Sequence, residues 1–114
     1  MVLKGLSRIL EDEGYYVKTA ISKDEAVEEV STERYDIVHV DLVLPYADGV
    51  AVCKEVKKRS PDTEVVLFSG HPKKLARHRS DFLNAGGRNE ILRKPLDGEE
   101  IISITEKILK EKKR

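Results

Sequence analysis

The chain alternates between compact apolar runs and segments in which apolar residues recur at helical spacing. Apolar positions three to four residues apart predict helices over residues 2–13, 22–34, 48–60, 72–84 and 97–114. Apolar and β-branched runs predict strands over residues 15–21, 36–42, 64–68 and 90–93. Helices and strands therefore follow one another in strict alternation along the whole chain.

The two central apolar runs indicate the kind of sheet. Neither run shows the alternation of polar and apolar positions that marks a strand with one solvent-exposed face. The runs are DIVHVDL at residues 36–42 and EVVLF at residues 64–68. Such runs are typical of parallel strands that are buried on both faces. Strict helix and strand alternation with short connections likewise favours a parallel sheet covered by helices on both faces. We therefore predict a doubly wound α/β fold.

The composition fits one globular domain over residues 1–114, with 39% apolar and 37% charged positions. The lone Cys53 cannot form an intramolecular disulfide, which favours a reducing, cytoplasmic setting. No apolar run approaches the roughly 20 residues that cross a bilayer, so we expect no membrane segment. The formal net charge is zero, but residues 1–57 carry an excess of acidic side chains and residues 58–114 an excess of basic ones.

Three polar residues stand at the ends of predicted parallel strands. Asp41 lies near the end of one run, Ser69 follows the next, and Lys94 follows the last. Because ligands of open parallel sheets bind beyond the carboxyl ends of the strands, we expect the three side chains to face one crevice. Singly, each has a structural explanation in a turn, a helix cap or the solvent. Together they form a functional combination. The carboxylate of Asp41 can act as a nucleophile or a metal ligand, and it would lie near the hydroxyl of Ser69 and the cation of Lys94, which suits a phosphoryl group.

Three segments also match the pattern of a known family. They read YDIVHVDLVLPYADG at residues 35–49, EVVLFSG at residues 64–70 and LRKP at residues 92–95. With these segments the chain resembles the receiver domains of two-component response regulators. The resemblance covers essentially the whole chain and implies a flavodoxin-like sheet and a role in signal transduction.

The resemblance assigns a role to each residue at the strand ends. It implies that Asp41 accepts a phosphoryl group from a sensor histidine kinase or a phosphotransfer protein, forming an acyl phosphate. Lys94 would pair with phosphoryl oxygens, and Ser69 would donate a hydrogen bond and act as the switch residue. Asp41 and the backbone carbonyl of Val43 would hold Mg²⁺ with waters, and the bond before Pro95 would be cis. We expect no enzymatic activity beyond self-dephosphorylation.

The resemblance also implies a strand ahead of the first helix that ends in two acidic metal ligands. The chain starts at Met1 inside that helix, so we expect this central strand and the acidic pair to be missing. The loss of a central strand would leave a gap in the sheet. Three explanations stay open: a start codon assigned too far downstream, a truncated protein in which this gap closes or is filled by a partner, and a deliberate cut. With fewer anionic ligands, Mg²⁺ should bind weakly and phosphorylation of Asp41 should be slow or absent.

Basic side chains cluster between the strands predicted over residues 64–68 and 90–93, at Lys73, Lys74, Arg77, His78 and Arg79. A solvated helical face explains this cluster, and so does the docking of an acidic protein partner. The resemblance places downstream partners on the face formed by residues 71–97. We expect no nucleic-acid partner, because no reading helix or interleaved aromatic residues accompany the cluster. The gap left in the sheet by a missing central strand would favour association into homo-oligomers.

Three functional hypotheses follow. The first is a receiver domain that changes its protein contacts when Asp41 is phosphorylated. The alternative is a degenerate receiver that takes no phosphate and acts as a protein-interaction or strand-exchange module. A flavodoxin-like enzyme is disfavoured, because the sequence has neither a Gly-rich phosphate loop nor the aromatic residues that would stack on a ring.

Overall fold

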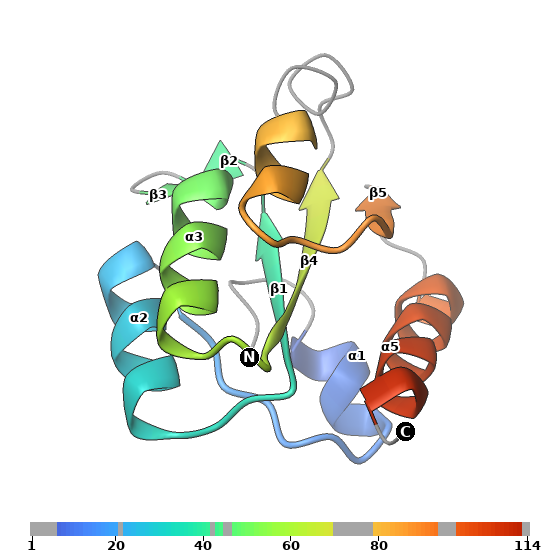
Figure 1. Ribbon diagram of the computed structural model, residues 1–114. Helices are drawn as coiled ribbons and strands as arrows, with labels where there is room; N and C mark the ends of the chain where they lie inside the picture. The colour runs from blue at the N-terminus through green and yellow to red at the C-terminus, as the bar shows by residue number, and fades with distance from the viewer. Residues whose placement is uncertain are drawn as a thin grey trace.

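The structure, a computed structural model, describes residues 7–20, 22–41, 43–44, 47–69, 79–93 and 98–112. Its helices are α1 (Ser7–Asp12), α2 (Lys23–Thr32), α3 (Gly49–Arg59) and α5 (Gly98–Lys112). Its strands are β1 (Ile37–Asp41), β2 (Val43–Leu44), β3 (Ala47–Asp48), β4 (Glu64–Ser69) and β5 (Ile91–Arg93). Residues 79–84 are also helical (Figure 1).

The principal sheet is parallel and contains β1, β4 and β5 in that order. Its ladder pairs Asp41 with Phe68, and Ser69 with Arg93. The three strands therefore end at the same edge of the sheet, as the alternation of helices and strands predicts. The parallel sheet is confirmed.

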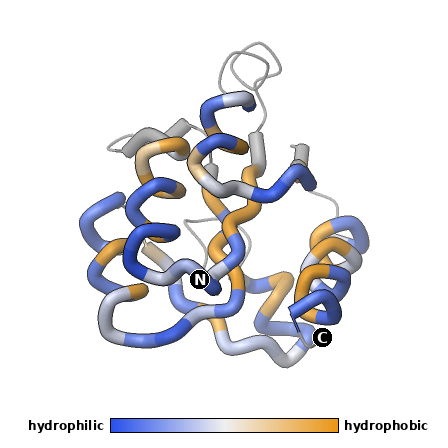
Figure 2. Tube along the Cα trace, viewed as in Figure 1, coloured by the Kyte–Doolittle hydropathy of each residue, from blue (hydrophilic) through white to orange (hydrophobic). Residues whose placement is uncertain are grey.

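Helices cover both faces of this sheet. Figure 1 shows α2 and α3 on one face and α1 and α5 on the other. Val38 and Val40 of β1 belong to a core cluster with α2 and α3, whereas Ile37 belongs to a second cluster with α1 and α5. Successive residues of β1 thus point to opposite faces, and residues 37–40 are buried. This burial explains the continuous apolar runs, which Figure 2 shows along β1 and β4, and it confirms the doubly wound arrangement.

The run predicted as a strand over residues 15–21 does not form one in its described part, residues 15–20, where Thr19 makes a single bridge. The prediction was wrong because β propensity alone does not make a strand, which also needs a neighbouring backbone for its ladder bonds. The run still contributes to the core. Ala20 is fully buried, and Tyr15 and Val17 pack against the second cluster.

The segment between β1 and α3 contains a small antiparallel ladder. Val43 pairs with Asp48, and Leu44 pairs with Ala47. Helix α3 begins immediately afterwards, at Gly49. The sequence did not predict this ladder, because strands of two residues are too short to give a periodic signal.

Two glycines return the chain from the helical segment 79–84 to the sheet. Gly86 has φ of 96°, in the left-handed region that favours glycine after a helix. The N–H of Gly87 donates to the carbonyl of Phe82 at 3.0 Å. The Phe82 ring, only 1% exposed, fills the first cluster, and the N–H of Arg88 then donates to the Val65 carbonyl of β4 at 2.9 Å.

None of the described helices combines the length and apolarity that a membrane span requires.

Candidate functional site

The carboxyl ends of β1 and β4 form the candidate site. Asp41 is the last residue of β1 and Ser69 is the last residue of β4. Because β1 and β4 are neighbours and Asp41 is in register with Phe68, one residue before Ser69, the backbones at Asp41 and Ser69 lie about 6 Å apart. The structure thus brings together two of the backbone positions that the sequence singled out.

The other predicted site residues are described only in part. Val43 opens β2, two residues beyond Asp41. Lys94 and Pro95 follow the last residue of β5 directly, and both lie outside the described residues, as does the predicted cis bond. The side chains of Asp41, Val43 and Ser69 also lie outside the described part. The roles assigned to these residues therefore stay predictions.

Two of the predicted site residues carry oxygens of the kind that would suit Mg²⁺. Over the described residues, no group of three or more His, Cys, Asp or Glu side chains is placed to hold a metal. Asp41 and the Val43 carbonyl would supply hard oxygen ligands, the kind that Mg²⁺ prefers. Mg²⁺ commonly keeps several of its waters, so two protein oxygens suit a largely hydrated ion.

A buried hydrogen bond joins the strand of Asp41 to α5. His39 stands two residues before Asp41, and its Nε2 lies 3.3 Å from Oγ1 of Thr105. The two residues are 2% and 3% exposed. His39 is therefore a packed residue of the strand. Thr105 was missed, although a hydroxyl residue between Ile101 and Ile108 on the apolar stripe of α5 was a visible signal.

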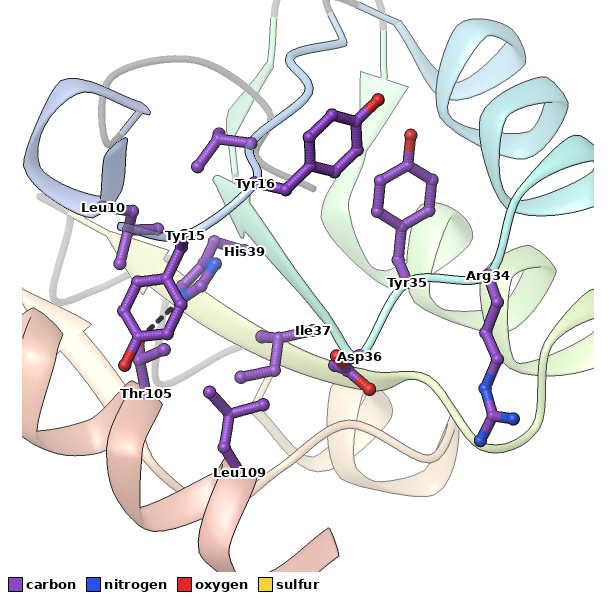
Figure 3. A pocket seen from close by; sticks show the side chains of 11 residues that line it. Leu10, Tyr15, Tyr16, Arg34, Tyr35, Asp36, Ile37, His39, Thr105 and Leu109 are labelled. Atoms are coloured by element: carbon purple, nitrogen blue, oxygen red, sulfur yellow. Dashed lines mark hydrogen bonds between the residues drawn. The ribbon is translucent and has the colours of Figure 1, made fainter. Parts of the chain in front are cut away.

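A pocket of about 170 Å³ opens beside this hydrogen bond. It lies between α1, the segment 15–17, β1 and α5 (Figure 3). Residues on its walls include Leu10, Val17, Ile37, His39, Thr105 and Leu109. Because these residues are far apart in the sequence, periodicity gave no sign of the pocket.

Tyrosines border the same pocket. Tyr35 donates its hydroxyl proton to the carboxylate of Glu29 at 2.8 Å and is also 3.2 Å from that of Glu33. Burial and these two carboxylates raise the pKa of Tyr35 well above its ordinary value, and burial also raises the pKa of Tyr15. Both phenols therefore stay protonated near neutral pH and do not act as bases. Tyr16, 65% exposed, lies beside Tyr35 (Figure 3).

An ion-pair cluster joins β4 and the start of β5 to the C-terminal half of α5. The Arg88 guanidinium lies 2.7 Å from Glu90, 2.5 Å from Glu111 and 3.7 Å from Glu64. Lys107 of α5 adds a second cation 3.3 Å from Glu90. Hydrogen bonds from Arg88 lower the pKa of Glu90 to about 2, and those carboxylates raise the pKa of Arg88 above its ordinary value. This cluster is structural and lies away from the carboxyl edge of the sheet.

The single cysteine is part of the core. Cys53 is fully buried in α3, and its thiol lies 3.7 Å from the carbonyl of Ala85. Burial raises the pKa of the thiol to about 11, although nearby Lys57 opposes the shift. The thiolate needed for nucleophilic chemistry is therefore scarce at neutral pH.

Comparisons with known sequences point to one family. Residues 1–106 match the family model described as the response regulator receiver domain. The nitrogen assimilation regulatory protein NtrX of Azorhizobium caulinodans is 30% identical over 109 residues, which cover 89% of this chain and 22% of that protein. Among the curated relatives compared, the chain spans 22% to 48% of the full length.

Solved structures give the same result for the fold. The receiver domain of NtrX from Brucella abortus superposes with a TM-score of 0.82 and 28% identity, covering 92% of this chain and 87% of that one. A response regulator protein from Burkholderia pseudomallei, crystallised with a phosphorylated aspartic acid, a calcium ion and citrate, gives a TM-score of 0.73 and 27% identity. That match covers 86% of this chain and 56% of the other. The flavodoxin-like fold predicted from the sequence is confirmed.

Proposed function

Because the chain belongs to the response regulator receiver domain family of two-component systems, we propose that it accepts a phosphoryl group on Asp41 and changes its protein contacts in response. The observation that carries this proposal is the position of Asp41 and Ser69 at the ends of adjacent parallel strands. Lys94 comes directly after β5, the next strand of the sheet. Receiver domains are phosphoacceptors, and we propose no activity beyond self-dephosphorylation.

The proposed reaction transfers a phosphoryl group from a phosphohistidine. A carboxylate oxygen of Asp41 attacks the phosphorus, a P–O bond forms, and the P–N bond to the donor breaks. The histidine nitrogen leaves with the electron pair and takes up a proton. Lys94 and the Ser69 hydroxyl would neutralise the charge on the phosphoryl oxygens. Mg²⁺, held by Asp41 and the Val43 carbonyl, would supply further positive charge.

Intact-mass analysis tests the proposal. The protein is incubated with acetyl phosphate and Mg²⁺, beside an Asp41→Asn variant and an Asp36→Asn control. Asp36 directly precedes β1 and is exposed, so it offers a carboxylate close in sequence but at the opposite end of the strand. We expect one phosphoryl adduct on the wild type and on Asp36→Asn, and none on Asp41→Asn. Because Mg²⁺ would neutralise charge on the phosphoryl oxygens, the adduct should form only when Mg²⁺ is present.

The same measurement distinguishes the alternative function. A folded wild type that gains no adduct even at high Mg²⁺ would overturn phosphorylation and support a degenerate receiver that acts by protein contact alone. An adduct that persists in Asp41→Asn would instead contradict the assignment of the acceptor residue.

The proposed partners are proteins. A sensor histidine kinase or phosphotransfer protein would supply the phosphoryl group in the cytoplasm, and a downstream protein would dock on the face formed by residues 71–97. In the described part of that face, Leu83 is an exposed large apolar residue and Arg79 donates to Asn89 at 2.7 Å. An exposed apolar residue near a basic one suits a partner with an acidic surface.

A further inference from the structure

We propose that the hydrogen bond between His39 and Thr105 couples the phosphorylation state of Asp41 to the position of α5. The proposal rests on the proposed phosphorylation of Asp41 and concerns how its effect reaches a distant element. His39 and Thr105 would be positioning residues, because they act through β1 and α5 and not on the reacting atoms.

The strand provides a short and stiff connection. His39 and Asp41 are two residues apart in β1, a distance of about 7 Å along an extended backbone. Both are held in register with β4, His39 opposite Val66 and Asp41 opposite Phe68. A displacement at the Asp41 end of β1 is therefore transmitted to His39, since the ladder leaves the strand little freedom to bend between them.

The hydrogen bond passes that displacement to the helix. Thr105 lies near the middle of α5, between Ile101 and Ile108, which are fully buried in the second core cluster. Breaking the bond would remove the contact between His39 Nε2 and the Thr105 hydroxyl in an apolar interior. The loss of a buried hydrogen bond costs free energy. If β1 is displaced, either α5 moves with it or the hydrogen bond breaks at a cost in free energy. The joint movement of β1 and α5 is therefore favoured.

The pocket beside the bond leaves room for such a movement. Its volume of about 170 Å³ lies between β1, α5, α1 and the segment 15–17. Figure 3 shows His39 and Thr105 meeting at this pocket, with Leu109 of α5 and Ile37 of β1 close by. A close-packed interior resists small displacements, whereas a pocket of this size lets side chains on either side rearrange.

Hydrogen exchange of the α5 amides tests the coupling. Exchange is measured before and after treatment with acetyl phosphate and Mg²⁺, and the mass of the intact protein in the same samples reports the adduct. The variant is Thr105→Val, which keeps the shape of the side chain and removes the hydroxyl. We expect phosphorylation to change α5 exchange in the wild type, and this change to shrink by about threefold or more in Thr105→Val. Thr105→Ser, which restores a hydroxyl, should recover the response.

Thr63→Val is the matched control for lost stability. Thr63 is also fully buried, and its Oγ1 donates to the carbonyl of Tyr35 at 2.7 Å, but it does not belong to α5. It should keep the wild-type response of α5 to phosphorylation. An undiminished response in Thr105→Val, or an equal loss in Thr63→Val, would overturn the coupling.

A double-mutant cycle tests the coupling without phosphorylation. Urea unfolding is measured for Asp41→Asn, for Thr105→Val and for the two together, and again with Thr63→Val in place of Thr105→Val. We expect the cycle with Thr105 to depart from additivity by about threefold in the unfolding equilibrium constant, and the cycle with Thr63 to be additive. Additivity in both cycles would overturn the coupling. Absence of an adduct in the mass measurement would overturn the proposed phosphorylation, and the cycle would then still decide whether position 41 and Thr105 of α5 are energetically coupled.

Discussion

The carboxylate of Glu90 links stability to pH through its contact with Arg88. Hydrogen bonds from Arg88 lower the pKa of Glu90 from 4.5 to about 2. Because the folded pKa lies below the unfolded one, the stabilisation is complete above about pH 4.5 and is lost as the pH falls toward 2. We predict that the free energy of unfolding, measured by urea titration at several pH values, falls by about 2 kcal/mol across this window because of Glu90.

Two variants isolate that effect. Glu90→Gln should remove the fall in the free energy of unfolding that Glu90 causes between about pH 4.5 and 2. Glu55→Gln should leave that fall unchanged. Glu55 makes a long ion pair of 3.9 Å with Arg59 on the surface, where such pairs contribute little. Equal pH dependence of unfolding in the wild type and in Glu90→Gln would contradict the prediction.

Gly87 is required by the packing of its neighbour. A Cβ at this position would overlap the ring of Phe82, which is buried and cannot easily move. We predict that Gly87→Ala lowers the free energy of unfolding by about 1–3 kcal/mol, measured by urea unfolding.

Gly98→Ala is the control for that substitution. A Cβ on Gly98, at the start of α5, would meet Ile9 at an ordinary distance of 3.9 Å. Alanine is the better helix former, so this variant should be as stable as the wild type or slightly more stable. If the two alanine variants were equally stable, overlap with Phe82 would not be what requires glycine at position 87.

Single residues differed in how far the sequence could predict them. Asp41 and Ser69 could be found because each ends a buried run, and the register then placed their backbones at one edge. The burial of Cys53 followed from its place on the apolar stripe of a helix. The partnership of His39 with Thr105 could not be found, because it joins residues 66 positions apart and depends on how α5 packs against β1.

At the scale of elements, the first turn of α2 offers a simple test of local structure. Ser22 precedes the helix, and its Oγ accepts a hydrogen bond from the N–H of Glu25 at 3.2 Å, as the sequence predicts. We predict that Ser22→Ala lowers the free energy of unfolding by about 1 kcal/mol, because an N–H at the helix start loses its partner. Thermal or urea unfolding measures the change.

An exposed serine inside a helix provides the comparison. Ser103→Ala, on the outer side of α5, should leave stability unchanged or raise it slightly. A Ser22→Ala protein as stable as Ser103→Ala would show that the cap is not needed.

Elements with a long periodic pattern were predicted well, and those that depend on neighbours were not. Helices α2, α3 and α5 and strands β1 and β4 begin and end within two residues of the predicted bounds. The run over residues 15–21 has strong β propensity, yet its described residues form no strand, because ladder bonds come from a partner and not from the run itself. The ladder between β2 and β3 was missed because it is too short to show a period.

At the scale of the whole molecule, the layered architecture followed from the order of the elements. Alternating helices and strands require a parallel sheet with helices on both faces, and the two core clusters on either side of β1 show this arrangement. The pocket beside α5 is a tertiary feature with no counterpart in the sequence pattern. The absence of the family's first strand stays a prediction, since residues 1–6 lie outside the described part.

The central claim, that Asp41 is the phosphoacceptor, can be tested most directly by locating the modified residue. After treatment with acetyl phosphate and Mg²⁺, the protein is reduced with borohydride, which converts an aspartyl phosphate into homoserine and releases the phosphate. Tandem mass spectrometry of the peptides then identifies the altered position. We predict homoserine at residue 41, with Asp36 and Asp48 unchanged. Homoserine at another aspartate, or none in a protein that carries a phosphoryl adduct, would contradict the claim.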